Sequence, residues 1–95
     1  MRVRLSSEAK QDLTAIGDYI ARDNPARARF FVKELIDGCA DLARRPLSCP
    51  LVPRYEAKGI RRCVHGNYQI FYRANGEQIQ VARILHGARD HEALL

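Results

Sequence analysis

Four arginines in the C-terminal part of the 95-residue chain are the side chains best suited to chemistry. Arg61, Arg62, Arg83 and Arg89 lie within or just beyond short runs of apolar residues. Guanidinium makes forked hydrogen bonds to phosphate and carboxylate groups. A single arginine on an exposed sheet is usually an ordinary solubilising residue, but several on one small sheet favour a binding surface. We therefore predict that these four arginines contact an anionic target.

His86 adds a group that can exchange protons, because imidazole titrates near neutral pH. With Arg62 and Arg89 it forms a weak set of catalytic candidates for phosphodiester cleavage, which needs a base, an acid and cations. The simpler explanation of His86 is a strand-end residue that hydrogen-bonds the following turn. We therefore assign no catalytic residue firmly.

Composition narrows the classes of partner and site. The formal charge of +5 and a pI near 9.5 favour an anionic partner, either nucleic acid or an acidic protein surface. The apolar runs are too short to cross a membrane and no secretory signal is evident, so we expect a cytoplasmic protein without a membrane partner. Three cysteines without C-x-x-C or zinc-finger spacing predict free thiols at Cys39 and Cys63, with no disulfide, metal or cofactor.

The arginines are positioned by a predicted three-stranded antiparallel meander. Gly66-Asn67 and Asn75-Gly76 separate runs rich in β-branched and aromatic residues, and Asn-Gly is typical of a type I′ hairpin turn. The alternation changes phase near Arg83, which a β-bulge would explain. The strands are expected over residues 60–64, 68–72 and 79–85.

The N-terminal half predicts a short strand followed by a helical hairpin. Residues 2–5 alternate, and Ser6 or Ser7 can cap a helix over residues 7–22. Asn24 and Pro25 are a typical N-cap and first helical residue for a second helix to about Arg44.

Three further features complete the predicted fold. Gly17 suggests a close approach of the two helices, and the proline-rich residues 46–54 are expected to be a plain connector. Residues 88–95 are expected to form a short C-terminal helix or tail. The element order β-α-α-β-β-β predicts one α+β domain over residues 1–95, with the hairpin packed on one face of an antiparallel sheet.

Several segments resemble the ParE/RelE toxin superfamily, on the ParE side. They are A-K-Q-D-L-T-A-I-G-D-Y-I in the first helix, N-P-A-R-A at the start of the second, I-R-R-C-V-H-G-N-Y-Q-I-F-Y-R across the first hairpin and I-L-H-G-A-R-D near the C-terminus. The resemblance implies a toxin of a type II toxin–antitoxin system. ParE toxins inhibit DNA gyrase, whereas RelE toxins cut messenger RNA on the ribosome.

The resemblance also implies a cognate antitoxin, whose C-terminal helix and extended segment wrap the toxin in a higher-order hetero-oligomer. Phe30 is the candidate antitoxin contact, because it lies beside the core positions Phe31 and Val32 and would be exposed in an isolated monomer. Packing of Phe30 under the proline-rich loop is the equal alternative.

Measured against RelE-like enzymes, the catalytic set is incomplete. Ile60 and Gln69 stand where cations are expected, and the chain ends in Leu94-Leu95 where a tyrosine is expected. We therefore favour gyrase inhibition by binding over enzyme activity. The alternatives are a RelE-like ribosome-dependent mRNA endonuclease and a non-toxic relative that only binds the antitoxin.

Overall fold

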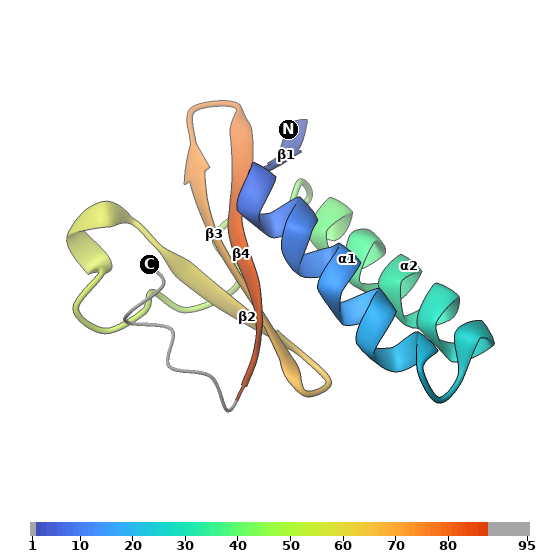
Figure 1. Ribbon diagram of the computed structural model, residues 1–95. Coiled ribbons are helices and arrows are strands. Elements are labelled where there is room, and N and C mark those ends of the chain that lie inside the picture. Colours follow the sequence, from blue (N-terminus) through green and yellow to red (C-terminus); the bar gives the residue numbers. More distant parts are fainter. Residues whose placement is uncertain (1, 88–95) are drawn as a thin grey trace.

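A helical hairpin covers one face of a four-stranded sheet in the computed structural model, which describes residues 2–87 (Figure 1). The sheet has the order β1-β4-β3-β2. Its elements are β1 (Arg2–Leu5), α1 (Ser7–Ala21), α2 (Pro25–Asp41), a 3-10 turn η1 (Glu56–Lys58), β2 (Arg61–His65), β3 (Tyr68–Asn75) and β4 (Gln78–His86). The predicted α+β class and element order are confirmed. The expected C-terminal helix or tail lies outside the described residues.

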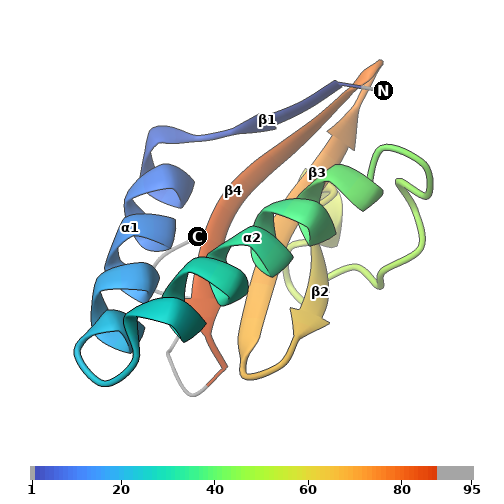
Figure 2. The same cartoon turned by 90° about the vertical axis from the view of Figure 1, so that its right-hand side faces the viewer.

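The sheet is mixed, which corrects the antiparallel prediction. β2, β3 and β4 form the expected antiparallel meander, but β1 pairs with β4 in parallel. Alternation in residues 2–5 indicates a strand without indicating its partner. The two helices, β2 and β3 separate β1 from β4 in the chain, and the two edge-to-edge strands run in the same direction (Figure 2).

Both hairpin turns have a two-residue loop with glycine first. Gly66 and Gly76 have φ of 60° and 62°, while Asn67, Asn75 and Glu77 have no positive φ. This is the pattern of a type II′ turn, whose first central residue is glycine. The predicted type I′ turn at Asn75-Gly76 is therefore wrong, because β3 extends through Asn75 and moves the loop by one residue.

The helices begin and meet as their sequence indicates. The Ser6 and Asn24 side chains accept the backbone N–H groups of Ala9 and Arg27, and Pro25 is the first residue of α2. A Cβ on Gly17 would lie 3.2 Å from Val32 Cγ2, so glycine permits the close approach of α1 and α2. The main core lies between these helices and the sheet. It includes Leu13, Ile16, Phe31, Leu35, Cys39, Ile70, Tyr72, Ile79, Val81 and Ile84.

The proline-rich segment covers the opposite face of the sheet, so it is not a plain connector. Val52 and Ile60 bury Phe71 and Leu85 in a second small core. On the helix side, where the segment begins, Tyr72 of the main core donates from Oη to the carbonyl of Pro46 at 2.9 Å. Because β3 carries hydrophobic side chains on both faces, both faces must be shielded from water. The helices shield one face and the proline-rich segment shields the other. The α2 helix accordingly ends at Asp41, earlier than expected.

A disulfide between Cys49 and Cys63 fastens this segment to β2. The prediction that Cys63 is a free thiol is wrong, because strand pairing brings two cysteines 14 residues apart to a Cα–Cα distance of 5.4 Å. A disulfide closing a loop of this size contributes about 3 kcal/mol in the chain-entropy model. Cys39 is the expected buried free thiol, and burial raises its pKa to about 11.

A bulge in β4 explains the change of phase near Arg83. Phe71 pairs with Arg83 and Tyr72 pairs with Val81, so Ala82 is the extra residue. This extra residue shifts the alternation of side chains by one position. Ile84 therefore faces the main core and Leu85 faces the second core. Among residues 2–87, no helix is long and apolar enough to cross a membrane.

Replacing Ser6 by Ala tests how α1 is fixed to the sheet. Ser6 Oγ accepts from Ala9 N at 2.9 Å and donates to Ala82 O at 2.6 Å, so both bonds are lost. We expect Ser6→Ala to lower the free energy of unfolding in urea by about 1–2 kcal/mol. Ser7→Ala is the matched control and should change it by less than about 0.5 kcal/mol. Equal losses would contradict this role for Ser6.

Candidate functional site

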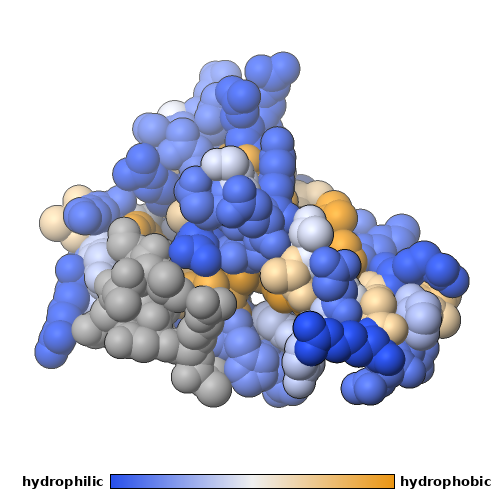
Figure 3. Space-filling view, in the orientation of Figure 1, coloured by the Kyte–Doolittle hydropathy of each residue, from blue (hydrophilic) through white to orange (hydrophobic). Residues whose placement is uncertain are grey.

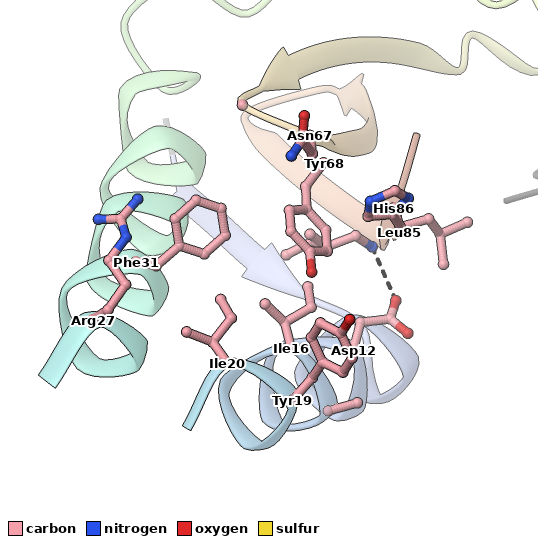
Figure 4. A pocket seen from close by; sticks show the side chains of 13 residues that line it. Asp12, Ile16, Tyr19, Ile20, Arg27, Phe31, Asn67, Tyr68, Leu85 and His86 are labelled. Atoms are coloured by element: carbon pink, nitrogen blue, oxygen red, sulfur yellow. Dashed lines mark hydrogen bonds between the residues drawn. The ribbon is translucent and has the colours of Figure 1, made fainter. Parts of the chain in front are cut away.

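The main groove lies where the second half of α1, the start of α2, the β2–β3 turn and the end of β4 meet. It has a volume of about 880 Å³. Its walls are mainly apolar, and Figure 4 shows Ile16, Ile20, Phe31 and Tyr68 around it. The lining residues are Asp12, Ala15, Ile16, Tyr19, Ile20, Arg27, Phe31, Gly66, Asn67, Tyr68, Ile84, Leu85 and His86.

A row of rings forms one wall of this groove. Phe31 lies 5.9 Å from His65 and 5.4 Å from Tyr68 between ring centroids, and Tyr68 meets His86 edge-on at 5.3 Å. Burial raises the pKa of the Tyr68 hydroxyl, and nearby Tyr19 raises it further. Tyr68 therefore stays protonated at neutral pH and can act as a hydrogen-bond donor in the groove.

Arg27 is the arginine among the residues that line the groove. Its carbon Cζ lies 5.1 Å from the Phe31 ring centroid, and Nη1 lies 3.2 Å from Glu34 Oε1. The hydrogen bond from Arg27 lowers the pKa of the exposed Glu34 carboxyl, with a smaller contribution from His65. The rim thus has a balanced pair of charges above apolar walls.

Arg83 is committed to a contact within the molecule. Its Nε and Nη2 donate to the two carboxylate oxygens of Asp12 at 2.8 and 2.9 Å, and Ile84 N donates to Asp12 Oδ2 at 2.9 Å. The Arg83 and Asp12 side chains are only 18% and 11% exposed. The hydrogen bond to Asp12 raises the pKa of Arg83. Sequence reasoning missed Asp12, because 71 residues separate the pair.

The other predicted arginines have different surroundings. Arg61 Nη1 donates to the carbonyls of Leu47 and Cys49 and thus holds the proline-rich segment. The half-buried Arg62 pairs in register with Phe71, and no hydrogen bond or ion pair of its side chain is found within residues 2–87. Arg89 lies outside the described residues.

The weak catalytic candidates Arg62 and His86 are not brought together. Arg62 lies opposite Phe71, whose side chain is in the second core, whereas His86 packs on Tyr68 beside the main core. Arg62 pairs with Phe71, and His86 pairs with Tyr68, which lies three residues from Phe71 along β3. Three residues correspond to about 10 Å along a strand and place the side chains on alternate faces. The two side chains therefore belong to opposite faces of the sheet. Within residues 2–87, no group of three His, Cys, Asp or Glu side chains is arranged to hold a metal ion.

Phe30, the predicted antitoxin contact, points away from both cores. Its side chain is 66% exposed, so the alternative of packing under the proline-rich segment does not occur. A second groove lies on the outer side of the hairpin, and Phe30 is not among its lining residues. This hairpin groove is lined by Gly17, Ala21, Pro25, Ala28, Arg29, Val32, Lys33 and Ile36.

A helical hairpin on a four-stranded sheet with this order is the RelE/ParE-like fold, and comparison with known proteins agrees. The family model "ParE toxin of type II toxin-antitoxin system, parDE" matches residues 3–91. The chain therefore belongs to the ParE toxin family. A search of curated protein sequences gives no match.

Two solved structures are similar over most of the chain. One is the chromosomal ParDE toxin–antitoxin system from P. aeruginosa, with 25% identity and a TM-score of 0.76. The other is the RelBE2 toxin–antitoxin complex from Mycobacterium tuberculosis, with 25% identity and a TM-score of 0.67. Each alignment covers 90% of this chain and 95% of the similar chain.

Replacing Arg83 by Gln tests its structural role. The change leaves the mostly buried Asp12 carboxylate with one of its three hydrogen bonds, so we expect a loss of about 2 kcal/mol in the free energy of unfolding. Arg73→Gln removes an exposed arginine whose side chain donates to Gln80, and should change the free energy of unfolding by less than about 0.5 kcal/mol. Urea unfolding of both variants measures the difference. If the Arg83→Gln variant were as stable as the wild type, Arg83 would again be a candidate for contact with the target.

Proposed function

We propose that this ParE-family toxin acts in the cytoplasm by binding DNA gyrase and blocking replication, and that a cognate antitoxin neutralises it. The family match over residues 3–91 carries the proposal. The net positive charge supports a target that includes DNA, because DNA is the polyanion that gyrase holds.

The geometry supports inhibition by binding more than cleavage of RNA. In-line cleavage needs an acid and a base on either side of one phosphate, with cations beside them. Arg62 and His86 belong to opposite faces of the sheet, and the wall beside His86 is aromatic. Within residues 2–87, the predicted catalytic set therefore does not converge on one point.

Arg62 is the strongest of the predicted target contacts. Arg61 donates to loop carbonyls and Arg83 donates to Asp12. The Arg62 guanidinium makes no such contact within residues 2–87 and can therefore bind a partner. Arg61 and Arg83 then act by holding the sheet and its cover in place. Arg89 remains a proposed contact that follows the last strand in the sequence.

Purified toxin added to gyrase, ATP and relaxed plasmid tests the proposal. We expect loss of supercoiling and, after protein digestion, linear DNA, with both effects reversed by the antitoxin. Arg62→Gln should weaken the effect more than Lys33→Gln, which removes the same charge from the helical hairpin. Unaffected gyrase, together with cuts in a reporter messenger on intact ribosomes, would instead identify an endonuclease.

The hairpin groove is the proposed seat of an antitoxin helix, with an extended segment along the main groove. Both similar solved structures are toxin–antitoxin systems, which supports such a partner. Small residues line the floor of the hairpin groove, and Arg29 and Lys33 border it. An amphipathic helix fits such a groove with its apolar side inward and acidic residues at the rim. We further propose that the pair assembles into a higher-order hetero-oligomer.

Replacing Phe30 by Ala tests the proposed antitoxin surface. Exposed aromatic side chains are frequent energetic centres of interfaces, so we expect antitoxin affinity to fall about 30-fold, corresponding to about 2 kcal/mol. Val64→Ala is a matched control, because Val64 is 70% exposed on β2 and lines neither the main groove nor the hairpin groove. Calorimetric titration of both variants measures the affinities. Equal affinities would exclude Phe30 from the interface.

A further inference from the structure

The net charge of the protein resides on the sheet and its loops. Residues 6–45, which contain both helices, carry seven basic and seven acidic side chains. The rest of the described chain, residues 2–5 and 46–87, carries eight basic and only two acidic side chains. Figure 3 shows hydrophilic side chains gathered over the end of the sheet where β1 and the β3–β4 turn lie. An anionic partner is therefore attracted to the sheet rather than to the helices.

Strand register brings several of these cations to one hollow. Gln80 pairs with Arg4 on one side and Arg73 on the other, and Gln78 pairs with Arg2 and Asn75 in the next such row. Neighbouring strands lie about 4.8 Å apart, so the Cα atoms of Arg4 and Arg73 are about 10 Å apart. Arg4, Lys58, Arg73, Gln78 and Gln80 line one depression of about 540 Å³, which we call the basic hollow.

The cations of the basic hollow are available to a ligand. Arg73 Nε donates to Gln80 Oε1 at 3.1 Å, which orients the guanidinium and leaves its terminal nitrogens open. Among the described residues, Lys58 has only a cation–π contact with Tyr55, at 5.9 Å, and Arg4 is exposed. Within residues 2–87, no ion pair engages these three side chains.

Acidic groups stay outside the basic hollow. The residues that line it include no carboxylate. Glu77, in the β3–β4 turn, and Glu56, in η1, are the nearest in sequence, and both are exposed. The hollow thus has three basic groups and two amides around one depression, without a built-in counter-charge.

We propose that the basic hollow, extended by Arg2 on the neighbouring row of β1, binds the phosphate backbone of double-stranded DNA. This inference rests on the proposed function, in which the toxin acts on DNA held by gyrase, and it assigns the DNA contact to a group of residues that does not include Arg62. Arg4 and Arg73 hold phosphate oxygens from two sides, Lys58 adds a point charge, and Gln78 and Gln80 donate amide hydrogens.

The chemistry of the hollow favours a duplex over single-stranded RNA or DNA. Proteins that bind single strands stack the bases on exposed aromatic rings. The one aromatic residue in the lining, Tyr72, is fully buried, and its hydroxyl is bonded to Pro46 O. A surface with cations and amides but no exposed ring can grip a backbone and cannot hold unstacked bases.

Fluorescence anisotropy with a labelled duplex of arbitrary sequence tests the proposal. The purified toxin is titrated at several salt concentrations from 50 to 200 mM. The test variant is the Arg4→Gln/Arg73→Gln double substitution. The matched control, Lys10→Gln/Arg22→Gln, removes the same charge from exposed positions in α1 and at its C-cap. Circular dichroism of all three proteins verifies that they are folded.

Loss of two phosphate contacts should reduce the slope of log affinity against log salt by about 2 and weaken binding at least about tenfold. The control should retain the wild-type slope. Equal weakening of both variants would overturn the proposal, since overall charge alone would then explain binding. Tighter binding to a single-stranded RNA of equal length, or no duplex binding at 50 mM salt, would also overturn it.

The gyrase assay separates this inference from the proposed function. Gyrase poisoning without duplex binding would overturn the basic hollow and leave the proposed function intact. Duplex binding that depends on Arg4 and Arg73, in a toxin that leaves gyrase unaffected, would support the hollow while refuting gyrase as the target. The double variant should poison gyrase less than the control variant when both inferences hold.

Discussion

The structure depends on how the free edge of β4 is covered after β1 ends. β1 pairs only with Gln78–Val81, so the rest of the β4 edge has no strand partner on that side. α1 replaces the missing strand: Ser6 N and Oγ donate to Val81 O and Ala82 O, and Asp12 accepts from Ile84 N and Arg83. An uncovered edge would be open to pairing with other chains. These bonds also set the direction of α1, and through Gly17 that of α2.

One bulge allows the same strand to serve two cores. Before Ala82 the main-core residues of β4 are Ile79 and Val81, and after it Ile84 occupies the main core while Leu85 enters the second. A strand with strict alternation would place these residues differently, since successive side chains point to opposite faces. The extra residue also brings Arg83 and Ile84 N to Asp12. The edge contact and the two-sided packing therefore share one cause.

Local signals could be predicted from the sequence, and long-range partners could not. The caps at Ser6 and Asn24, the close approach at Gly17 and the bulge near Arg83 all depend on residues within a few positions of each other. The parallel pairing of β1, the Cys49–Cys63 bond and the partner of Arg83 depend on strand register and on the return of the chain after two helices. The basic hollow was missed for the same reason, because Arg4 and Arg73 become neighbours only across β4.

The separation of charge between the helices and the sheet gives the molecule an electric dipole. A protein with neutral helices and a positive sheet turns in the field of a polyanion before contact, so encounters occur sheet first. The helical hairpin then trails on the far side, away from the polyanion. Orientation during approach raises the rate of association at low ionic strength, and salt reduces it as the Debye length falls below the size of the molecule. The arrangement of charges thus selects the face of first contact before any specific bond has formed.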